Sequence, residues 1–420
     1  MVGHRLKSLP RYVIADQRVV WLMLGMTVTG YVVFMYLRLG EDLYQWTKTL
    51  APFSVRQYLD MSKRFALQYG HLFFLLPILY LSKFLLTGDR TPAWLESFIR
   101  IARPHTVPIF IFHVPFLYFF ASLWRHDPKD GWDQTALAVA TIAACIVLGR
   151  FCAFLKPVAY RIAPPMSVWI DRMFPDQLVA PPEAPERATG SFSNFLHLLQ
   201  ILAMATVFIG HFTYSEFSAL DLPGMAAWRR WAVPFFFITS GYMAMLSIDK
   251  RPASVGELIA GRVSSLWIFV LPMLILVPIL DHIGYGLAPG IYEANEKYID
   301  VAAGTGGPVD MAAFLLTFLN SSLFLNEIIA YKLAGFGTLE GGVRAYTNDA
   351  FWFLCYLVPY IMMLVIGVKT TGWRRILWLG GLFLFFGPPI MLLAPLFFGG
   401  CLVYILHREK RPSNLDETTA

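Results

Sequence analysis

Stretches of about 20 apolar residues recur from one end of this chain to the other, and they limit its possible folds more than any other feature. A helix of that length crosses the hydrocarbon core of a bilayer, where an open sheet or loop would leave backbone hydrogen bonds unsatisfied. Apolar residues make up 57% of the 420 residues and charged residues only 15%. Soluble domains carry roughly 25% charged residues. The sequence therefore predicts an all-α, polytopic membrane helix bundle, and it excludes a soluble, disordered or nucleic-acid-binding protein.

Eight of the apolar runs have the length of one membrane span, and one further run is long enough for two. The single spans are predicted at 19–38, 66–87, 106–124, 135–155, 194–213, 231–248, 263–281 and 351–368. The longer run, 376–406, is interrupted by Gly387-Pro388-Pro389 and is predicted to form two short, tilted or re-entrant pieces. The total is about ten transmembrane helices.

The stretch 311–331 is apolar as well, but it contains Asn320-Ser321-Ser322 and Asn326-Glu327. A span at this position would place the basic residues of 369–375 outside the cell. We therefore expect a partly buried or interfacial helix inside a long outer segment, 282–350.

Lysine and arginine near the helix ends predict the orientation. The net charge is +6, and such an excess in a membrane protein is typical of its cytoplasmic loops. Basic residues gather in 5–18, 90–103 and 150–161, whereas the loop 125–133 contains three aspartates. This distribution places both termini in the cytoplasm. The first helix lacks a small-residue cleavage site, so it is predicted to be retained rather than removed as a signal peptide.

A proline-rich segment divides the chain. Residues 157–192 contain seven prolines and few apolar runs, which predicts a cytoplasmic linker. The linker would join a four-span unit, 1–156, to a six-span unit, 193–408, and a short cytoplasmic tail would follow at 409–420.

Motifs of soluble enzymes are absent. The sequence has no P-loop, no GxGxxG, no GxSxG and no HExxH. The four cysteines all lie in apolar runs without a CxxC pair or a Cys/His cluster, which predicts buried free thiols and neither disulfides nor a metal site: Cys145, Cys152, Cys355 and Cys401. The candidates for chemistry are therefore polar groups at membrane depth, which are costly to bury and often functional.

The run 194–213 carries a polar stripe. On a helix His211 lies about 20° from Gln200 and about 40° from His197, so the three residues share one face. His211 is expected near the outer end, and His197 about 20 Å closer to the cytoplasm. The face either lines two ends of a tunnel, with His211 catalytic and His197 and Gln200 binding substrate, or it serves helix packing.

Two further positions have both a functional and a structural interpretation. Ser240-Gly241 interrupts an aromatic-rich helix. Either these small residues allow helices to approach closely, or Ser240 contacts the substrate. Arg262 begins the next span as a snorkelling anchor or as a bidentate clamp on a phosphate or carboxylate.

The order of these features resembles the membrane-bound acyltransferase-3 family over about residues 190–406. A helix ending in histidine is followed by Phe-Phe-x-x-Ser-Gly and then by an arginine-bearing helix with proline. Residues 348–353, which include Trp352, and 396–400 are similar to two later helices of the family. The spacing of the family's Asp, Arg and His is kept, but His197, Gln200 and His211 occupy it, so only His211 inherits the catalytic role. The acidic residue expected after Trp352 is absent.

The N-terminal unit contains a second resemblance. Residues 102–120, which include His113, are similar to a helix found late in the family, and residues 149–157 to the family's last span. The chain is therefore either circularly permuted or a fusion of two unrelated modules. In a permuted chain the helix of His113 packs beside those of His211 and Ser240, and His113 serves as a ligand for substrate or as a proton relay.

The resemblance implies an O-acyltransferase of the bacterial inner membrane that needs no metal. It would move an acyl group, expected to be acetyl, from cytoplasmic acyl-CoA to a hydroxyl of an exported polysaccharide or lipid-linked glycan. His211 would act as general base or accept the acyl group transiently. The substrate-binding candidates are Arg262, His197, Gln200, Ser240, His113 and Trp352.

Two alternatives remain open. A non-catalytic membrane subunit or conduit of a polysaccharide synthesis or secretion complex would explain the missing family residues. A membrane glycosyltransferase that uses a lipid-phosphate sugar would place acidic residues in the first outer loop, where Glu41-Asp42 lie. The predicted partners are the bilayer, acyl-CoA, the glycan acceptor and other polysaccharide-synthesis proteins, without nucleic acid.

Overall fold

The computed structural model describes residues 17–50, 59–86, 91–174, 190–220, 225–249, 253–294, 311–328 and 346–408. These ranges form helices and turns without a β-strand, and nine of the helices are long and apolar enough to cross a membrane. The predicted all-α membrane bundle is therefore confirmed. The expected cytoplasmic tail, 409–420, and the second half of the predicted linker lie outside the described residues.

The long helices begin and end within a few residues of most predicted spans. They are α2 (Gln17–Tyr36), α5 (Phe65–Leu85), α7 (Thr106–Leu123), α8 (Gly131–Ala153), α10 (Gly190–Phe212), α11 (Met225–Asp249), α12 (Val255–Leu287), α17 (Trp352–Lys369) and α18 (Gly372–Arg408). Gly387 has a positive φ of 75° inside α18 and divides it into two limbs, as Gly387-Pro388-Pro389 predicted.

Shorter helices connect or flank these spans: α3 (Leu39–Leu50), α6 (Ala93–Ala102), α9 (Lys156–Met173), α13 (Pro289–Glu293), α15 (Met311–Ser322) and the 3₁₀ turns η2 (Asp60–Arg64), η3 (Arg103–His105) and η4 (Asp349–Phe351). Helix α15 has 12 residues, which corresponds to about 18 Å of rise and is too short to cross a bilayer. Its outer side is apolar and exposed at Leu315, Leu316 and Leu319. Within the described residues 311–328, the predicted non-spanning helix is therefore observed.

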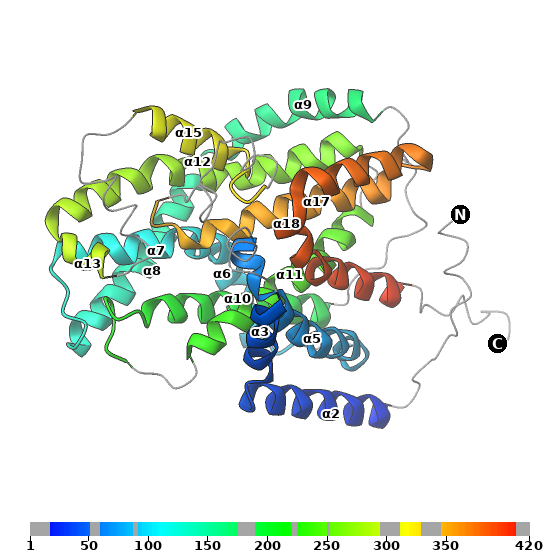
Figure 1. Ribbon diagram of the computed structural model, residues 1–420, viewed down its shortest axis with the longest axis horizontal. Coiled ribbons are helices and arrows are strands. Elements are labelled where there is room, and N and C mark those ends of the chain that lie inside the picture. Colours follow the sequence, from blue (N-terminus) through cyan, green and yellow to red (C-terminus); the bar gives the residue numbers. More distant parts are fainter. Residues whose placement is uncertain are drawn as a thin grey trace.

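The first half of the proline-rich segment, predicted to be a linker, is a helix. Helix α9 runs along α12, above it in Figure 1. Pro157 lies in the first turn of α9, where a proline removes no intrahelical hydrogen bond, and α9 also contains Pro164 and Pro165 in its interior. Asp171 ties the two helices together, because its carboxylate accepts from Ser254 Oγ at 2.6 Å and from the Gly256 amide at 2.8 Å.

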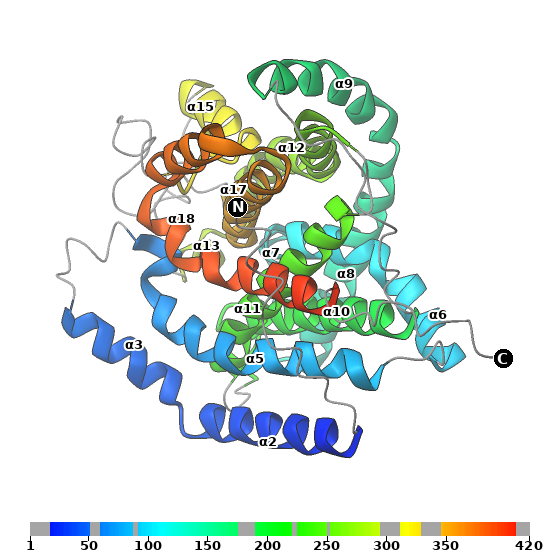
Figure 2. The same cartoon turned by 90° about the vertical axis from the view of Figure 1, so that its right-hand side faces the viewer.

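The N-terminal helices are part of the same bundle as the C-terminal ones. Helix α7 packs against α8, α10 and α12, while α5 packs against α18 and α11. Helix α2 lies at the lower edge in Figures 1 and 2, and its contacts are mainly with α5. Phe110 of α7 meets Phe236 of α11 with ring centroids 5.3 Å apart. The helix of His113 thus lies beside those of His211 and Ser240, which is the packing that a permuted chain requires.

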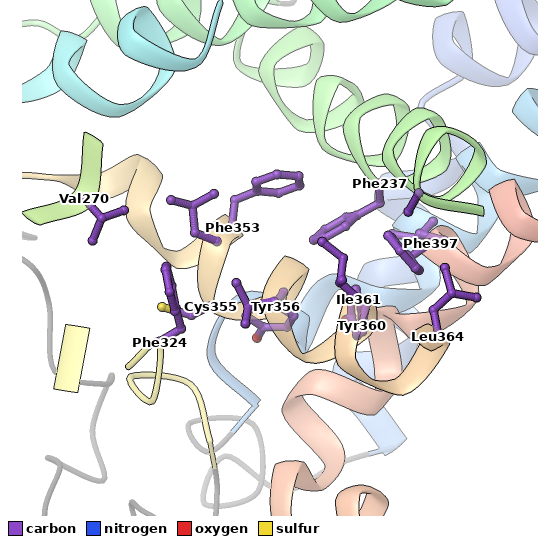
Figure 3. Packing of buried hydrophobic residues seen from close by; sticks show 14 of the residues in the cluster. Phe237, Val270, Phe324, Phe353, Cys355, Tyr356, Tyr360, Ile361, Leu364 and Phe397 are labelled. Carbon is purple, nitrogen blue, oxygen red and sulfur yellow. The ribbon is translucent and has the colours of Figure 1, made fainter. Parts of the chain in front are cut away.

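Helix α17 occupies the centre of the apolar core. Phe353 lies with its ring centroid 4.5 Å from that of Phe237 on α11, and Tyr360 lies between Phe237 at 5.5 Å and Phe397 of α18 at 5.6 Å. Figure 3 shows this row, with Phe237 and Phe397 toward one end and Phe324 toward the other. The core therefore holds the start of α17 in a fixed place, and that start follows directly on η4.

Candidate functional site

His113 lies in the middle of α7 with no exposed surface. Its Nδ1 is 2.8 Å from the Ile109 carbonyl oxygen and 3.0 Å from that of Phe110. A carbonyl oxygen only accepts hydrogen bonds, so Nδ1 must carry the proton and donate it. The Nε2 of a neutral His113 is then an acceptor.

His211, in the last turn of α10, occupies that acceptor. Its Nδ1 is 2.8 Å from His113 Nε2, and the two rings tilt by 38° with centroids 5.0 Å apart. Because His113 Nε2 accepts, His211 Nδ1 must be the donor. The backbone of α7 therefore fixes the direction of both hydrogen bonds, and a neutral His211 has its lone pair on Nε2.

Asp349 faces this second nitrogen. Its Oδ2 is 3.5 Å from His211 Nε2, and the two side chains are 11% and 8% exposed. The separation is an ion-pair distance rather than a short hydrogen bond. Asp349 begins η4, immediately before α17, so the central helix carries it into place. The carboxylate stabilises the imidazolium that forms when Nε2 takes up a proton.

Polar groups surround the His113–His211–Asp349 chain. Tyr214 meets His211 edge to face at 5.5 Å between ring centroids. Tyr118, further along α7, donates to the buried Glu216 at 2.5 Å. Asn348 is 3% exposed, and among the described residues neither atom of its side-chain amide has a hydrogen-bond partner. A buried polar group without a partner costs about 1–3 kcal/mol, so this amide is available to a ligand.

The rest of the predicted stripe on α10 lies far from His211. His197 is buried and Gln200 is half-buried on the same side of the helix as His211. Gln200 and Arg103 both lie close enough to interact with the His197 ring. His197 is 14 residues from His211, or about 21 Å along the helix. The stripe therefore faces the bundle over its whole length, but His211 is its one residue that bonds to His113.

The other predicted residues lie on three different helices, α12, α11 and α17. Arg262 is exposed on α12, about 28 Å along that helix from Asp281 at the opposite end. Ser240 is half-buried, and its neighbour Gly241 is where α11 crosses α18: a Cβ on Gly241 would lie 1.9 Å from the Phe397 carbonyl oxygen. Close packing thus explains Gly241. Trp352 packs edge to face on Tyr356 with ring centroids 5.5 Å apart.

The position expected to be acidic has a different chemistry. Cys355 lies with its Sγ 3.6 Å from the Asn326 side-chain oxygen, and that amide donates to Ser321 Oγ at 3.0 Å. All four cysteines are free and buried. In the ranges described above, no group of three or more His, Cys, Asp or Glu side chains gathers as metal ligands would.

Sequence reasoning missed Asp349 and its neighbours. Asp349 lay inside the segment compared with the family, but it precedes the helix and so belongs to no helical stripe. Asp281 was taken as the end of a span. A carboxylate within an apolar helix is itself a signal of function, and Asp281 is completely buried.

The fold and the site define a multi-pass membrane protein with a buried histidine pair between two parts of one bundle. Residues 193–416, just over half of the chain, match the sequence model of the acyltransferase-3 family, described as an acyltransferase domain. The chain belongs to this family, and it is an acyltransferase that transfers groups other than aminoacyl groups. No curated protein and no solved structure matches it.

Proposed function

We propose that this chain is an integral membrane O-acyltransferase in which His211 Nε2 is the general base. The observation that supports the proposal best is the His113–His211–Asp349 chain, because it combines a fixed tautomer with a carboxylate at the nitrogen that takes the proton. His211 was proposed as the catalytic residue, and its environment has the features that such a role requires.

The proposed reaction uses these positions. Nε2 removes the proton of an acceptor hydroxyl while the hydroxyl oxygen attacks the carbonyl carbon of an acyl thioester. The new C–O bond forms, the C–S bond breaks, and the imidazolium returns its proton to the departing thiolate. Asp349 stabilises the imidazolium between these steps, and the free amide of Asn348 is suited to bind the developing oxyanion.

Acyl-CoA, expected to be acetyl-CoA, is the donor in this proposal. Its phosphates suit Arg262, which is exposed near the end of α12 remote from Asp281. His197 and Gln200 lie on the inward side of α10, toward its start, where they would contact the extended donor arm. The acceptor is a hydroxyl of an exported polysaccharide or lipid-linked glycan.

The strongest competing proposal is a non-catalytic subunit of a polysaccharide secretion complex. It draws support from Gln200, which replaces the family's arginine, and from Cys355-Tyr356 in place of its acidic residue. The membrane glycosyltransferase has less support, because Glu41 lies on α3, and that helix packs on α5 and α2.

The experiment compares glycan ester content in cells that carry the wild-type chain, His211→Ala or no chain, at matched protein levels. Loss of the general base should reduce the acyl-transfer rate about 10²–10⁴-fold. Asp349→Asn should reduce it as well, because the imidazolium loses its counter-ion. Full acylation with His211→Ala would reject the catalytic assignment and favour the non-catalytic subunit.

A further inference from the structure

Asp281 is a carboxylate buried inside the apolar helix α12 that the proposed reaction does not use. It has no exposed surface. Both of its oxygens accept hydrogen bonds from one residue: the Thr347 amide donates to Oδ2 at 3.0 Å, and Thr347 Oγ1 donates to Oδ1 at 2.7 Å. Among the described residues it forms no ion pair with lysine or arginine. A buried carboxylate is costly, so its position calls for a specific reason.

The groups that surround Asp281 are neutral hydroxyls. Burial, and then the Asp281 carboxylate, raise the pKa of both Tyr292 and Tyr346 above the usual value for tyrosine, so both phenols stay protonated. Tyr292 is completely buried on α13. Asp281 therefore holds Thr347 by hydrogen bonds and forms no ion pair with a lysine or arginine among the described residues.

Thr347 belongs to the segment that carries the catalytic carboxylate. Tyr346, just before it, has a φ of 53°, which a non-glycine residue keeps only where neighbouring contacts hold it. Two residues after Thr347, Asp349 faces His211 Nε2. The segment is thus fixed to α12 at Thr347, and two residues later it approaches α10 at Asp349.

We propose that Asp281 is a positioning residue for the reaction: it anchors Thr347 through both backbone and side chain, and so places Asp349 at His211. The inference rests on the proposed function, because it explains how Asp349 is held beside His211, and the proposed function depends on that contact. Asp281 acts through Thr347 and Asp349 and does not contact the reacting atoms.

The substitutions that test this assignment differ in hydrogen bonding rather than size. Asp281→Asn keeps both bonds, because its carbonyl accepts from the Thr347 amide and its NH₂ donates to Thr347 Oγ1. Asp281→Leu removes both. Acyl transfer from radiolabelled acetyl-CoA to host glycan is measured in membranes that contain the full chain. Asp281→Leu should lower kcat about 10–100-fold, the effect of a misplaced catalytic group, with little change in the donor KM. Asp281→Asn should lose no more than a few-fold.

The double variant Asp281→Leu/Asp349→Asn separates the inference from its premise. If Asp281 acts through Asp349, the double variant is no slower than Asp349→Asn alone. Additive losses, or an Asp281→Asn variant as slow as Asp281→Leu, would overturn the positioning role. Full activity of Asp349→Asn would instead overturn the proposed function. Should Asp281→Leu fail to accumulate, Thr347→Val, which removes only the hydroxyl bond, should lower kcat while Thr347→Ser loses far less. Equal rates in those two variants would also contradict the role.

Discussion

At the scale of single residues, the site depends on which nitrogen of each histidine carries a proton. The Ile109 and Phe110 carbonyls determine this for His113, and His113 determines it for His211. In the proposed reaction the acceptor hydroxyl delivers its proton to His211 Nε2, and the other tautomer would already hold a proton there. Under this proposal the backbone of α7 contributes to the reaction through the hydrogen bonds of His113.

Substitutions of His113 should separate this role from simple packing. His113→Gln keeps a side-chain oxygen near the position of Nε2 that can accept from His211 Nδ1. His113→Phe keeps the ring and leaves that N–H buried without a partner, at a cost of about 1–3 kcal/mol. We expect His113→Phe to be about tenfold or more slower than His113→Gln in acyl transfer at matched protein levels. Equal rates would show that the hydrogen bond does not matter.

Asn348 should show opposite effects on activity and stability. Its amide has no partner in the described part of the chain, so Asn348→Leu should leave the unfolding temperature in detergent unchanged or raise it. Activity should fall about tenfold if the amide binds the acyl oxygen. Asn326→Leu is the matched control, because that amide donates to Ser321 Oγ and its loss should destabilise the protein by about 1–3 kcal/mol. A loss of stability in Asn348→Leu would contradict the prediction.

Residue-level prediction from the sequence succeeded where helical periodicity applied. His211 and His197 were placed on one inward side of α10, and both are buried. His113 was expected to face the bundle, and it does. Asp349 and Thr347 lie in a short irregular turn, where no period relates sequence to direction. Thr347 contacts α12 and Asp349 contacts α10, and only the tertiary packing of these helices determines such contacts.

At the scale of helices, α11 and α18 cross at their small residues. A Cβ on Gly400 would lie 1.9 Å from the Ile238 carbonyl oxygen, just as one on Gly241 would meet the Phe397 carbonyl oxygen. The backbones therefore approach closely at two reciprocal positions, as expected for helices that pack through small residues in a membrane. Cys401 Sγ also lies 3.3 Å from the Gly241 carbonyl oxygen at this crossing.

Matched glycine substitutions within α18 should test the crossing. Gly400→Ala forces backbone apart and should cost about 1–3 kcal/mol, the usual penalty of overpacking. Gly380→Ala in the same helix meets no atom within 4 Å and should be neutral or stabilising by up to about 1 kcal/mol. The unfolding temperatures of the two purified variants provide the comparison. If Gly400→Ala were as stable as Gly380→Ala, the two helices would not be in close contact.

Helix prediction from the sequence was accurate for apolar runs and poor for mixed ones. The span predicted at 106–124 is α7, Thr106–Leu123, because a long apolar run has few alternatives to a helix. The predicted 263–281 is longer, Val255–Leu287, since its polar first turn has a capping box between Ser254 and Glu257. Helices α3 and α9 were not expected, because charges and prolines obscure their amphipathic pattern.

At the scale of the whole molecule, the part that matches the family is incomplete without the N-terminal helices. The match covers 193–416, whereas His113 comes from α7. One bundle with α7 beside α10 and α11 meets the condition set by a circular permutation. Two separate modules with His113 facing lipid do not describe the structure. The permutation itself stays a prediction, and so does the orientation in the membrane.

Charge is distributed unevenly between the two ends of the bundle, and this supports the predicted orientation. Arg103 and Arg150 lie where α7 begins and α8 ends. The aspartate-rich loop 125–133 lies at the other end with His211, because the Ala219 amide donates to the Pro128 carbonyl at 2.7 Å and His126 bonds to the Phe217 carbonyl at 2.7 Å. With this distribution the positive-inside rule predicts that His211 lies at the outer face.

Labelling from outside the cell should decide the orientation. The four native cysteines are at most 4% exposed, so an impermeant thiol reagent should report only introduced ones. Lys129→Cys, exposed in the loop next to the His211 end, should be labelled in intact cells. Ala180→Cys, in the predicted cytoplasmic linker, should be labelled only after the membrane is permeabilised. Lys129 is preferred to Asp130, whose side chain accepts from the Trp132 amide at the start of α8. The reverse pattern would place His211 in the cytoplasm, and the acceptor would then have to be an intracellular hydroxyl rather than an exported glycan.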